Sequence, residues 1–185
     1  MRSIEPLKLI GTMPCSEVLD DHDSYVRMLL RFARTADVPF GRVNLSQRDE
    51  PRELWSGVTA HSVGTMCEFA LGLETGQVID FRLILEGEES SDSARRVKVG
   101  DPELPIIAHS SVPCLGPPAA LGLHQELDTA HWVLPSLSFV DTGTHDVVFF
   151  SAEAVTGRIV AGGTEFGVGA AGELVYIASS IGRRP

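Results

Sequence analysis

The chain has 185 residues, 43% of them hydrophobic and 22% charged, and its formal net charge is −10. This composition is typical of one globular domain, and it excludes collagen-like repeats and a chain that stays disordered. The excess of acidic side chains argues against nucleic acid and against an anionic membrane as partners, because both attract basic surfaces.

The three cysteines, Cys15, Cys67 and Cys114, are scattered along the chain and form no C-x-x-C pair. They are too few for a disulfide framework, so we expect free thiols in a reducing compartment. Glu5 and Pro6 interrupt the first apolar residues, which argues against a signal peptide. We therefore expect a cytoplasmic protein.

One segment, residues 17–36, has the periodicity of an amphipathic helix. Ser16 is a suitable N-cap, acidic residues follow it in the first turns, and Pro39 lies beyond the end of the segment. The apolar stripe consists of Val18, Tyr25, Leu29, Phe32 and Ala36. This pattern predicts a helix over residues 17–36, within an N-terminal helical extension that covers residues 1–40.

The rest of the chain has the pattern of strands and turns. Residues 66–73 and 79–86 alternate in polarity on either side of a turn at Gly76, which predicts a β-hairpin. Further strands are expected at residues 95–99, 120–126, 130–140, 146–150, 157–161 and 174–181. This spacing is typical of antiparallel barrels and sandwiches. We predict a mainly β protein with a single antiparallel β-barrel of about eight strands over residues 41–185, the helix being a lid or an outer packing element.

The sequence contains no G-x-S-x-G elbow, no phosphate-binding loop and no H-E-x-x-H motif. The glycine run from Gly162 to Gly172 follows an expected strand but precedes no expected helix, so it is not a dinucleotide fingerprint. His124 and His131, with Glu126 and Asp128 between them, are the one grouping that suggests a metal site, but they lack the spacing of a known ligand motif. We therefore expect neither a metal nor an organic cofactor.

Five ionisable residues interrupt the apolar patterns of the expected strands: Glu68, Asp80, Arg82, Glu126 and Glu165. In one interpretation they point outward into solvent, as the polar half of an alternating strand normally does. In the other, the mixed face lines the lumen of the barrel, where a desolvated carboxylate orients a ligand or acts as a general acid or base.

Two stretches of the chain resemble a known group of proteins. Residues 54–65, LWSGVTAHSVGT, followed by an apolar strand, resemble the opening strands of the allene-oxide-cyclase-like barrels. Residues 154–166, AVTGRIVAGGTEF, resemble a glycine-rich strand turn found late in those barrels. Both are similar in particular to the bacterial spirotetronate and spirotetramate cyclases, the pyrroindomycin-type Diels–Alderases of polyketide antibiotic biosynthesis.

The resemblance implies a cofactor-independent intramolecular [4+2] cyclase that forms a spiro-tetramate or spiro-tetronate ring from a hydrophobic polyketide. Such a reaction requires the diene and dienophile to be held against each other, with hydrogen bonds to a neighbouring carbonyl. Two alternatives remain open: a non-catalytic barrel that binds a hydrophobic small molecule, and an acid–base isomerase or dehydratase on the same barrel. A homodimer is compatible with each of them.

The candidate site residues follow from the polar and aromatic positions of the expected strands. The candidates for catalysis are Glu68, Gln125 and Glu165. The candidates for substrate binding are Trp55, Phe69, Phe81, Arg82, His131, Trp132, Phe139 and Phe150. Strand register decides which of these face a common lumen, because a shift of one residue turns every side chain to the opposite face.

Overall fold

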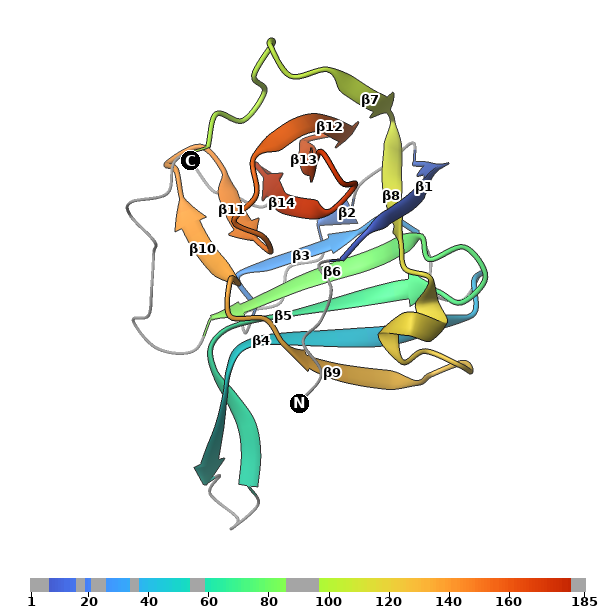
Figure 1. Cartoon of the computed structure of the whole chain (residues 1–185), viewed down its shortest axis with the longest axis vertical. Helices are drawn as coiled ribbons and strands as arrows, with labels where there is room; N and C mark the ends of the chain where they lie inside the picture. Colours follow the sequence, from blue (N-terminus) through green and yellow to red (C-terminus); the bar gives the residue numbers. More distant parts are fainter. Residues whose placement is uncertain are drawn as a thin grey trace.

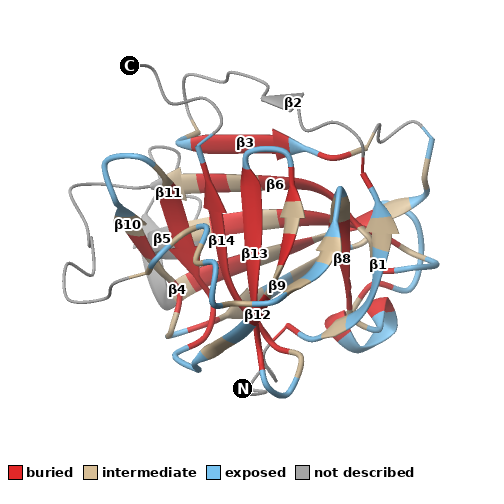
Figure 2. Cartoon of the chain, turned by 90° about the horizontal axis from the view of Figure 1, so that it is seen from above, coloured by how far each residue is buried: buried red, intermediate tan, exposed pale blue. Residues whose placement is uncertain are grey.

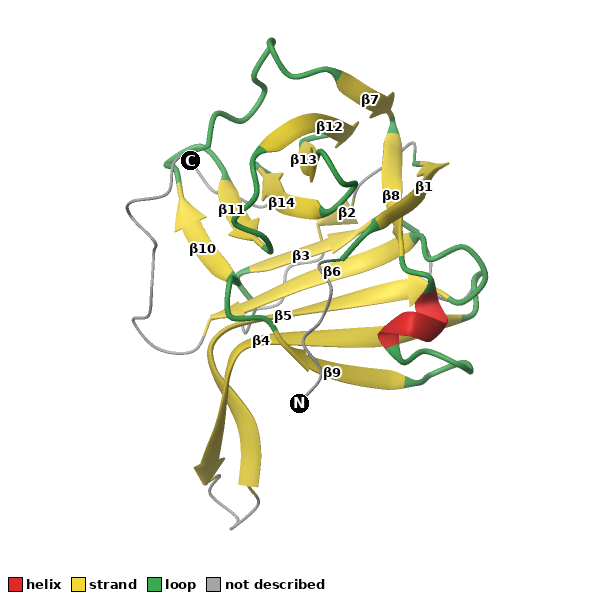
Figure 3. Cartoon of the chain, viewed as in Figure 1, coloured by secondary structure: helices red, strands yellow, loops and turns green. Residues whose placement is uncertain are grey.

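The computed structural model describes residues 7–15, 19–20, 26–33, 37–53, 59–85 and 97–180. These residues form fourteen strands, β1–β14, of which β2 has two residues. Within this part of the chain, the single helical element is a 3₁₀ turn, η1 (Pro118–Leu121), which Figure 3 shows in red. Pro118 opens this turn because its fixed φ angle suits a helical start and its missing N–H needs no partner there.

The first of two large sheets lies in the lower half of Figure 1 and has the strand order β2-β3-β6-β5-β4-β9. In that order the strands are β2 (Leu19–Asp20), β3 (Met28–Arg31), β6 (Val78–Leu85), β5 (Thr59–Gly72), β4 (Phe40–Glu53) and β9 (Thr129–Val133). Neighbours are antiparallel except β4 and β9, which are parallel. The strands β4 and β5 continue beyond the sheet as a two-stranded ribbon (Figure 1).

The second large sheet lies above the first in Figure 1 and has the order β10-β11-β14-β13-β12-β7. In that order the strands are β10 (Ser138–Asp141), β11 (Asp146–Phe149), β14 (Leu174–Ser179), β13 (Thr164–Gly169), β12 (Val155–Ala161) and β7 (Ile106–His109). The edge strand β7 runs parallel to β12, and the other pairs are antiparallel.

A third, two-stranded sheet links the two large ones. It pairs β1 (Leu9–Pro14) with β8 (Ser111–Leu115). The Leu9 N–H donates to the Gly172 carbonyl in the β13–β14 turn at 2.7 Å, and the Leu115 N–H donates to the Gly76 carbonyl in the β5–β6 turn at 2.8 Å. Gly76 has a φ of +72°, and a side chain there would overlap the Leu115 backbone. We call β1 and β8 the linking pair.

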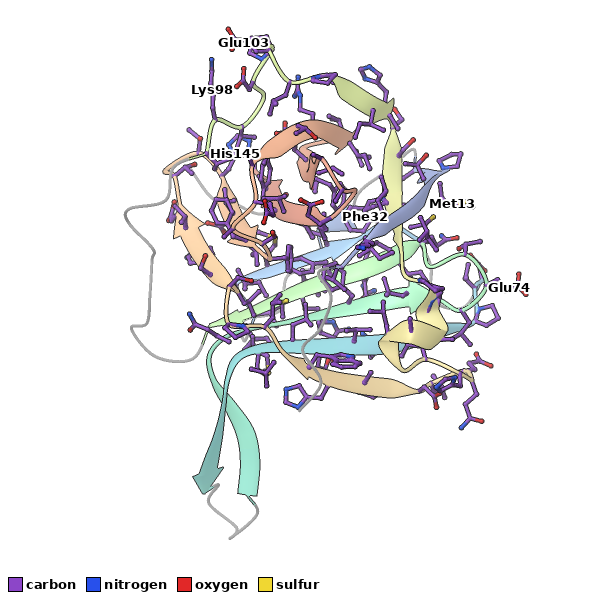
Figure 4. The ribbon with its side chains drawn as sticks, in the orientation of Figure 1. Met13, Phe32, Glu74, Lys98, Glu103 and His145 are labelled. Carbon is purple, nitrogen blue, oxygen red and sulfur yellow. The ribbon has the colours of Figure 1, made fainter. Side chains whose placement is uncertain are left out.

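Apolar side chains from both large sheets fill the space between them. The first sheet contributes Val43, Leu45, Cys67, Phe69, Phe81 and Leu83, and the second contributes Ile159, Phe166 and Ile177. Ring contacts cross this interior: the centroids of Phe69 and Phe150 are 5.5 Å apart, as are those of Phe32 and Phe166. Phe32 is labelled in Figure 4. The two sheets therefore share one continuous core.

The second sheet is buried on its other face as well. Residues 97–105, which we call the strap, precede β7 and place Val97 and Val99 against a separate apolar cluster that includes Val147, Phe149 and Tyr176. Strands β11, β13 and β14 are accordingly buried along most of their length (Figure 2). Lys98 and Glu103 of the strap point away from the sheet (Figure 4).

The predicted closed barrel is wrong. The molecule is mainly β, but its strands form three open sheets, and within the described residues no strand of one large sheet pairs with a strand of the other. The expected strand spacing is shared by barrels and sandwiches, so spacing alone does not separate them. Two of the strand pairs are also parallel, against the expectation of a purely antiparallel arrangement.

The predicted N-terminal helix and its role as a lid are also wrong. Met28, Leu29 and Leu30 are all buried, and they form β3, which pairs with β6 in the first sheet. A short apolar run fits a strand that is covered on both faces as well as it fits a helix, and here sheet pairing decides the outcome. Ser16 and, within the expected helix, residues 17–18, 21–25 and 34–36 lie outside the described residues. No helix in the described ranges is long and apolar enough to cross a membrane.

Candidate functional site

Four polar residues form a line across the first sheet, on the face that points away from the core. In the strand register, Arg82 of β6 lies opposite Glu68 of β5, Glu68 lies opposite Asn44 of β4, and Asn44 is the partner of His131 in β9. Directly paired residues point to the same side of a sheet, so these four side chains share one face. We call them the polar row.

The alternation of each strand explains why these residues are outside. Their neighbours Val43, Cys67, Phe81 and Leu83 are fully buried in the shared core. Because successive side chains of a strand point to opposite faces, burial of these apolar residues turns the polar row outward. Three of the sequence-predicted site residues, Glu68, Arg82 and His131, are thereby brought onto one surface.

Arg42 connects the polar row to a neighbouring carboxylate. Its Nη1 lies 2.6 Å from Glu68 Oε1 and 3.3 Å from Asp80 Oδ1. The residue paired with Arg42 across the sheet is Ala70, whose small side chain lets the guanidinium reach over to β6. Arg82 Nε is 3.9 Å from Glu68 Oε1, which is too long for a hydrogen bond. The side chains of Arg42, Glu68 and Arg82 are 25%, 23% and 32% exposed.

Polar atoms without partners collect in this sheet. In the described part of the chain, the buried side-chain atoms that lack a hydrogen bond are Asn44 Oδ1, Gln47 Oε1, Arg82 Nε and Glu173 Oε2. Asn44 and Arg82 belong to the polar row, and Gln47 lies three residues after Asn44 on β4. A buried polar group without a partner costs about 1–3 kcal/mol, so such groups are rare away from sites that bind water or a ligand.

The polar row ends at an exposed histidine that is held at one nitrogen. His131 Nε2 lies 2.6 Å from the Oγ of Ser46, and Ser46 is fully buried. Together the row offers a guanidinium, a carboxylate, an amide and an imidazole along one line. Binding of a polar small molecule and exchange of protons with it are both within the chemistry of this set.

The aromatic candidates lie elsewhere. Phe69, Phe81 and Phe150 are buried in the shared core and contact one another, with ring centroids 4.9–6.1 Å apart. Trp132 packs against the same core, and its indole N–H donates to the Leu121 carbonyl at 3.0 Å. Phe139 is also buried. That any of these aromatic side chains contacts a substrate stays a prediction. Trp55 is outside the described residues.

Glu165 lies in a second polar group, on the face of the second sheet that the strap covers. Its carboxylate accepts hydrogen bonds from the Tyr176 hydroxyl, from Arg158 Nη1 at 3.0 Å and from the Gly100 N–H of the strap at 3.0 Å. Burial and the bond to Glu165 raise the pKa of Tyr176. Glu165 and Glu68 point outward from opposite sheets with the core between them, so they do not form one site. We call Arg158, Glu165 and Tyr176 the buried cluster.

Gln125, the third catalytic candidate, lies in the exposed turn that leads into β9. Its backbone N–H and that of His124 each donate to Asp128 Oδ2 at 2.9 Å, and these bonds lower the pKa of Asp128. The turn is thus an ordinary side-chain-stabilised loop. Within the described residues, no group of three or more His, Cys, Asp or Glu side chains is placed to hold a metal ion.

Sequence reasoning missed Arg42, Asn44 and Ser46. The signal was present, because these three alternate with the apolar residues Val43 and Leu45 in the pattern of a half-buried strand. Comparison of the sequence with models of known protein families and with curated proteins gives no match.

Proposed function

We propose that the polar row is the active site of an enzyme that moves a proton on a small carbonyl compound, as an isomerase or a dehydratase does. The observation that carries this proposal is the unpaired state of Asn44 Oδ1 and Arg82 Nε on either side of Glu68. A buried acceptor and a buried donor that find no partner in the protein are suited to a ligand that supplies both.

The substrate carbonyl would accept the hydrogen bond that Arg82 Nε–H does not give within the protein. Negative charge that develops on this oxygen, when a proton leaves the neighbouring carbon, is stabilised by the guanidinium. A hydroxyl or N–H of the substrate would donate to Asn44 Oδ1. These two contacts fix both ends of the reacting part of the molecule.

Glu68 and His131 are the two groups that exchange protons with the substrate. Neighbouring strands are about 4.8 Å apart, so the Cα atoms of these residues, two strands apart, are separated by about 10 Å, with Asn44 between them. Glu68, oriented by Arg42, takes the proton from the carbon next to the carbonyl. His131 returns a proton to another carbon in an isomerisation, or protonates a departing hydroxyl in a dehydration.

The [4+2] cyclisation implied by the resemblance stays a prediction. It depends on an enclosed apolar space that folds the substrate, whereas the interior between the two sheets contains the tightly packed rings of Phe69, Phe81 and Phe150. The acid–base reaction needs only the partly exposed polar row. For this reason the acid–base alternative is the one that the geometry supports best.

Deuterium exchange tests the proposal without knowledge of the natural substrate. The purified chain is incubated in D₂O with a panel of ketones, lactams, enones and β-hydroxy esters, and NMR follows deuterium uptake next to the carbonyl. We expect uptake into at least one compound and a loss of at least about 100-fold in Glu68→Gln, whereas His131→Gln should keep this uptake and lose the isomerised or dehydrated product by a similar factor. His145→Gln, in the exposed β10–β11 turn of the second sheet (Figure 4), is the matched control.

Two results would contradict the proposal: no uptake into any compound, or uptake and product formation that the Glu68 and His131 variants leave unchanged. A parallel incubation with a linear polyene tetramate addresses cyclisation. A cyclised product that forms at the same rate in the His131→Gln variant would favour the cyclase over the acid–base enzyme.

A further inference from the structure

A fully buried serine lies beside the exposed histidine of the polar row. Ser46 follows Asn44 by two residues on β4, and in the parallel register it is the partner of Val133, two residues after His131. The Ser46 and His131 side chains therefore share one face, and the Ser46 Oγ–His131 Nε2 distance is 2.6 Å. The exposed imidazole on the edge strand β9 is thus hydrogen-bonded to a fully buried hydroxyl.

This contact fixes the ring at both of its ends. The imidazole is attached to the backbone through Cβ, and Nε2 is the nitrogen farthest from that attachment. With Nε2 held by Ser46, the ring has no free rotation about χ2, and Nδ1 is the remaining nitrogen. Since Nε2 is already in contact with the fully buried Ser46, Nδ1 is the ring nitrogen that is left for a substrate.

We propose that Ser46 is a positioning residue, which holds His131 with Nε2 toward the sheet and so makes Nδ1 the atom that exchanges the proton. The inference rests on the function proposed above for the polar row. A serine oxygen accepts hydrogen bonds as well as donating them. When it accepts from Nε2–H, Nδ1 is the nitrogen that gives its proton to the substrate, and the neutral ring that remains carries its lone pair on Nδ1.

The hydrogen bond between His131 Nε2 and Ser46 Oγ is kept at every stage of the proton transfer. Before the reaction both ring nitrogens carry hydrogen, and after Nδ1 has given its proton to the substrate, Nε2–H still donates to Ser46 Oγ. Solvent water then returns a proton to Nδ1 and accepts the proton that Glu68 took from the substrate, which restores both groups. No hydrogen moves on the buried side, so His131 passes through the cycle without rearranging its surroundings.

Long-range ¹H–¹⁵N NMR of the full-length, ¹⁵N-labelled protein tests this without a substrate. We expect neutral His131 to carry its hydrogen on Nε2 in the wild-type chain, and to become a mixture of both tautomers in Ser46→Ala. Ser46→Thr, which keeps the hydroxyl, should retain the wild-type tautomer. Ser136→Ala is the matched control, because Ser136 donates to the Phe150 carbonyl away from the polar row.

With a compound that the wild-type protein isomerises or dehydrates, Ser46→Ala should lower kcat by about 10- to 100-fold, leave KM nearly unchanged and alter the pH profile. A hydrogen on Nδ1 in the neutral wild-type ring would overturn the inference, even if Ser46→Ala does not fold. So would a tautomer that Ser46→Ala leaves unchanged. The expected tautomers combined with no exchange in any compound would instead count against the proposed function alone.

Discussion

The outward faces of the two large sheets each carry arginines paired with glutamate, but they differ in what covers them. On the second sheet, Glu165 accepts three hydrogen bonds, and the strap seals it so that its side chain is 7% exposed. On the first sheet, Glu68 is 23% exposed and lies between two groups with unpaired atoms, Asn44 and Arg82. Glu165 of the buried cluster finds its partners within the protein, whereas the polar row contains a donor and an acceptor without a hydrogen-bond partner.

This difference separates a structural use of charge from a functional one. A buried ion pair stabilises a fold only when every remaining donor and acceptor is satisfied, which the buried cluster achieves with a backbone N–H of the strap. The polar row leaves a donor and an acceptor unused at a cost in stability. Proteins keep such destabilising, unpaired polar groups mainly at sites that bind another molecule.

The largest expected effect comes from making the same change in both clusters. Glu165→Gln leaves the buried Arg158 charge without its counter-ion, so we expect the free energy of unfolding to fall by about 3–5 kcal/mol. Glu68→Gln changes a partly solvated pair and should cost about 1 kcal/mol or less. Urea denaturation of the two variants measures both. Equal losses would show that the polar row is a structural network like the buried cluster, and the comparison would fail.

Tyr176→Phe sharpens the comparison within the buried cluster. Loss of the hydroxyl that donates to Glu165 should cost about 1.5–3 kcal/mol. The raised pKa of Tyr176 also predicts a pH dependence. The unfolded chain releases the phenol proton above about pH 10 while the folded chain keeps it, so stability falls as pH rises beyond that value. Unfolding curves at pH 8 to 11 should show a shallower alkaline decline in the variant. A decline as steep as that of the wild type would mean that Tyr176 is not the group that causes the loss of stability at alkaline pH.

Gly167→Ala tests the packing that positions Tyr176. A methyl group at this position would overlap the Tyr176 ring, which lies across the glycine on the neighbouring strand. We expect a loss of about 1–3 kcal/mol, seen as a lower midpoint of thermal unfolding. Gly11→Ala in β1 is the control, because the nearest atom to its new methyl group is 4.0 Å away. Similar losses in the two variants would mean that the close contact with the ring is not the cause.

Asn44→Ala should have the smallest effect on stability. Since Asn44 Oδ1 has no partner, its removal should change the free energy of unfolding by no more than about 0.5 kcal/mol, or raise it. Deuterium exchange in a compound that the wild-type protein accepts should nevertheless be lost. A clear loss of stability would reveal that the amide contributes to the fold, and unchanged exchange would remove it from the site.

Local patterns in the sequence identified strands well where alternation was strong. The hairpin around Gly76 is confirmed as β5 and β6, and the strands expected at residues 146–150, 157–161 and 174–181 correspond to β11, β12 and β14. Residues 120–126 were expected to form a strand, but the end of η1 and a turn occupy them, because consecutive prolines favour a 3₁₀ start.

Local sequence patterns did not predict how the strands are arranged in sheets. Whether sheets close into a barrel depends on long-range pairing, and β4 finds its partner β9 more than seventy residues later in the chain. The candidate site was predictable in part: Glu68, Arg82 and His131 followed from polarity within strands. Asn44 and Ser46 alternate with apolar residues in the sequence, but their place beside His131 follows only from the parallel β4–β9 register.

The linking pair has a consequence for the order in which the chain folds. β1 is bonded to β8 and to the β13–β14 turn, so its partners are synthesised much later than β1 itself. The strand β8 becomes available first, and the bonds of Leu9 to Gly172 and of Leu7 to Leu174 can form only after most of the second sheet has been made. Closing such long loops is entropically costly and slow. The contacts between β1 and the β13–β14 turn should therefore form late in folding, after β13 and β14 have paired.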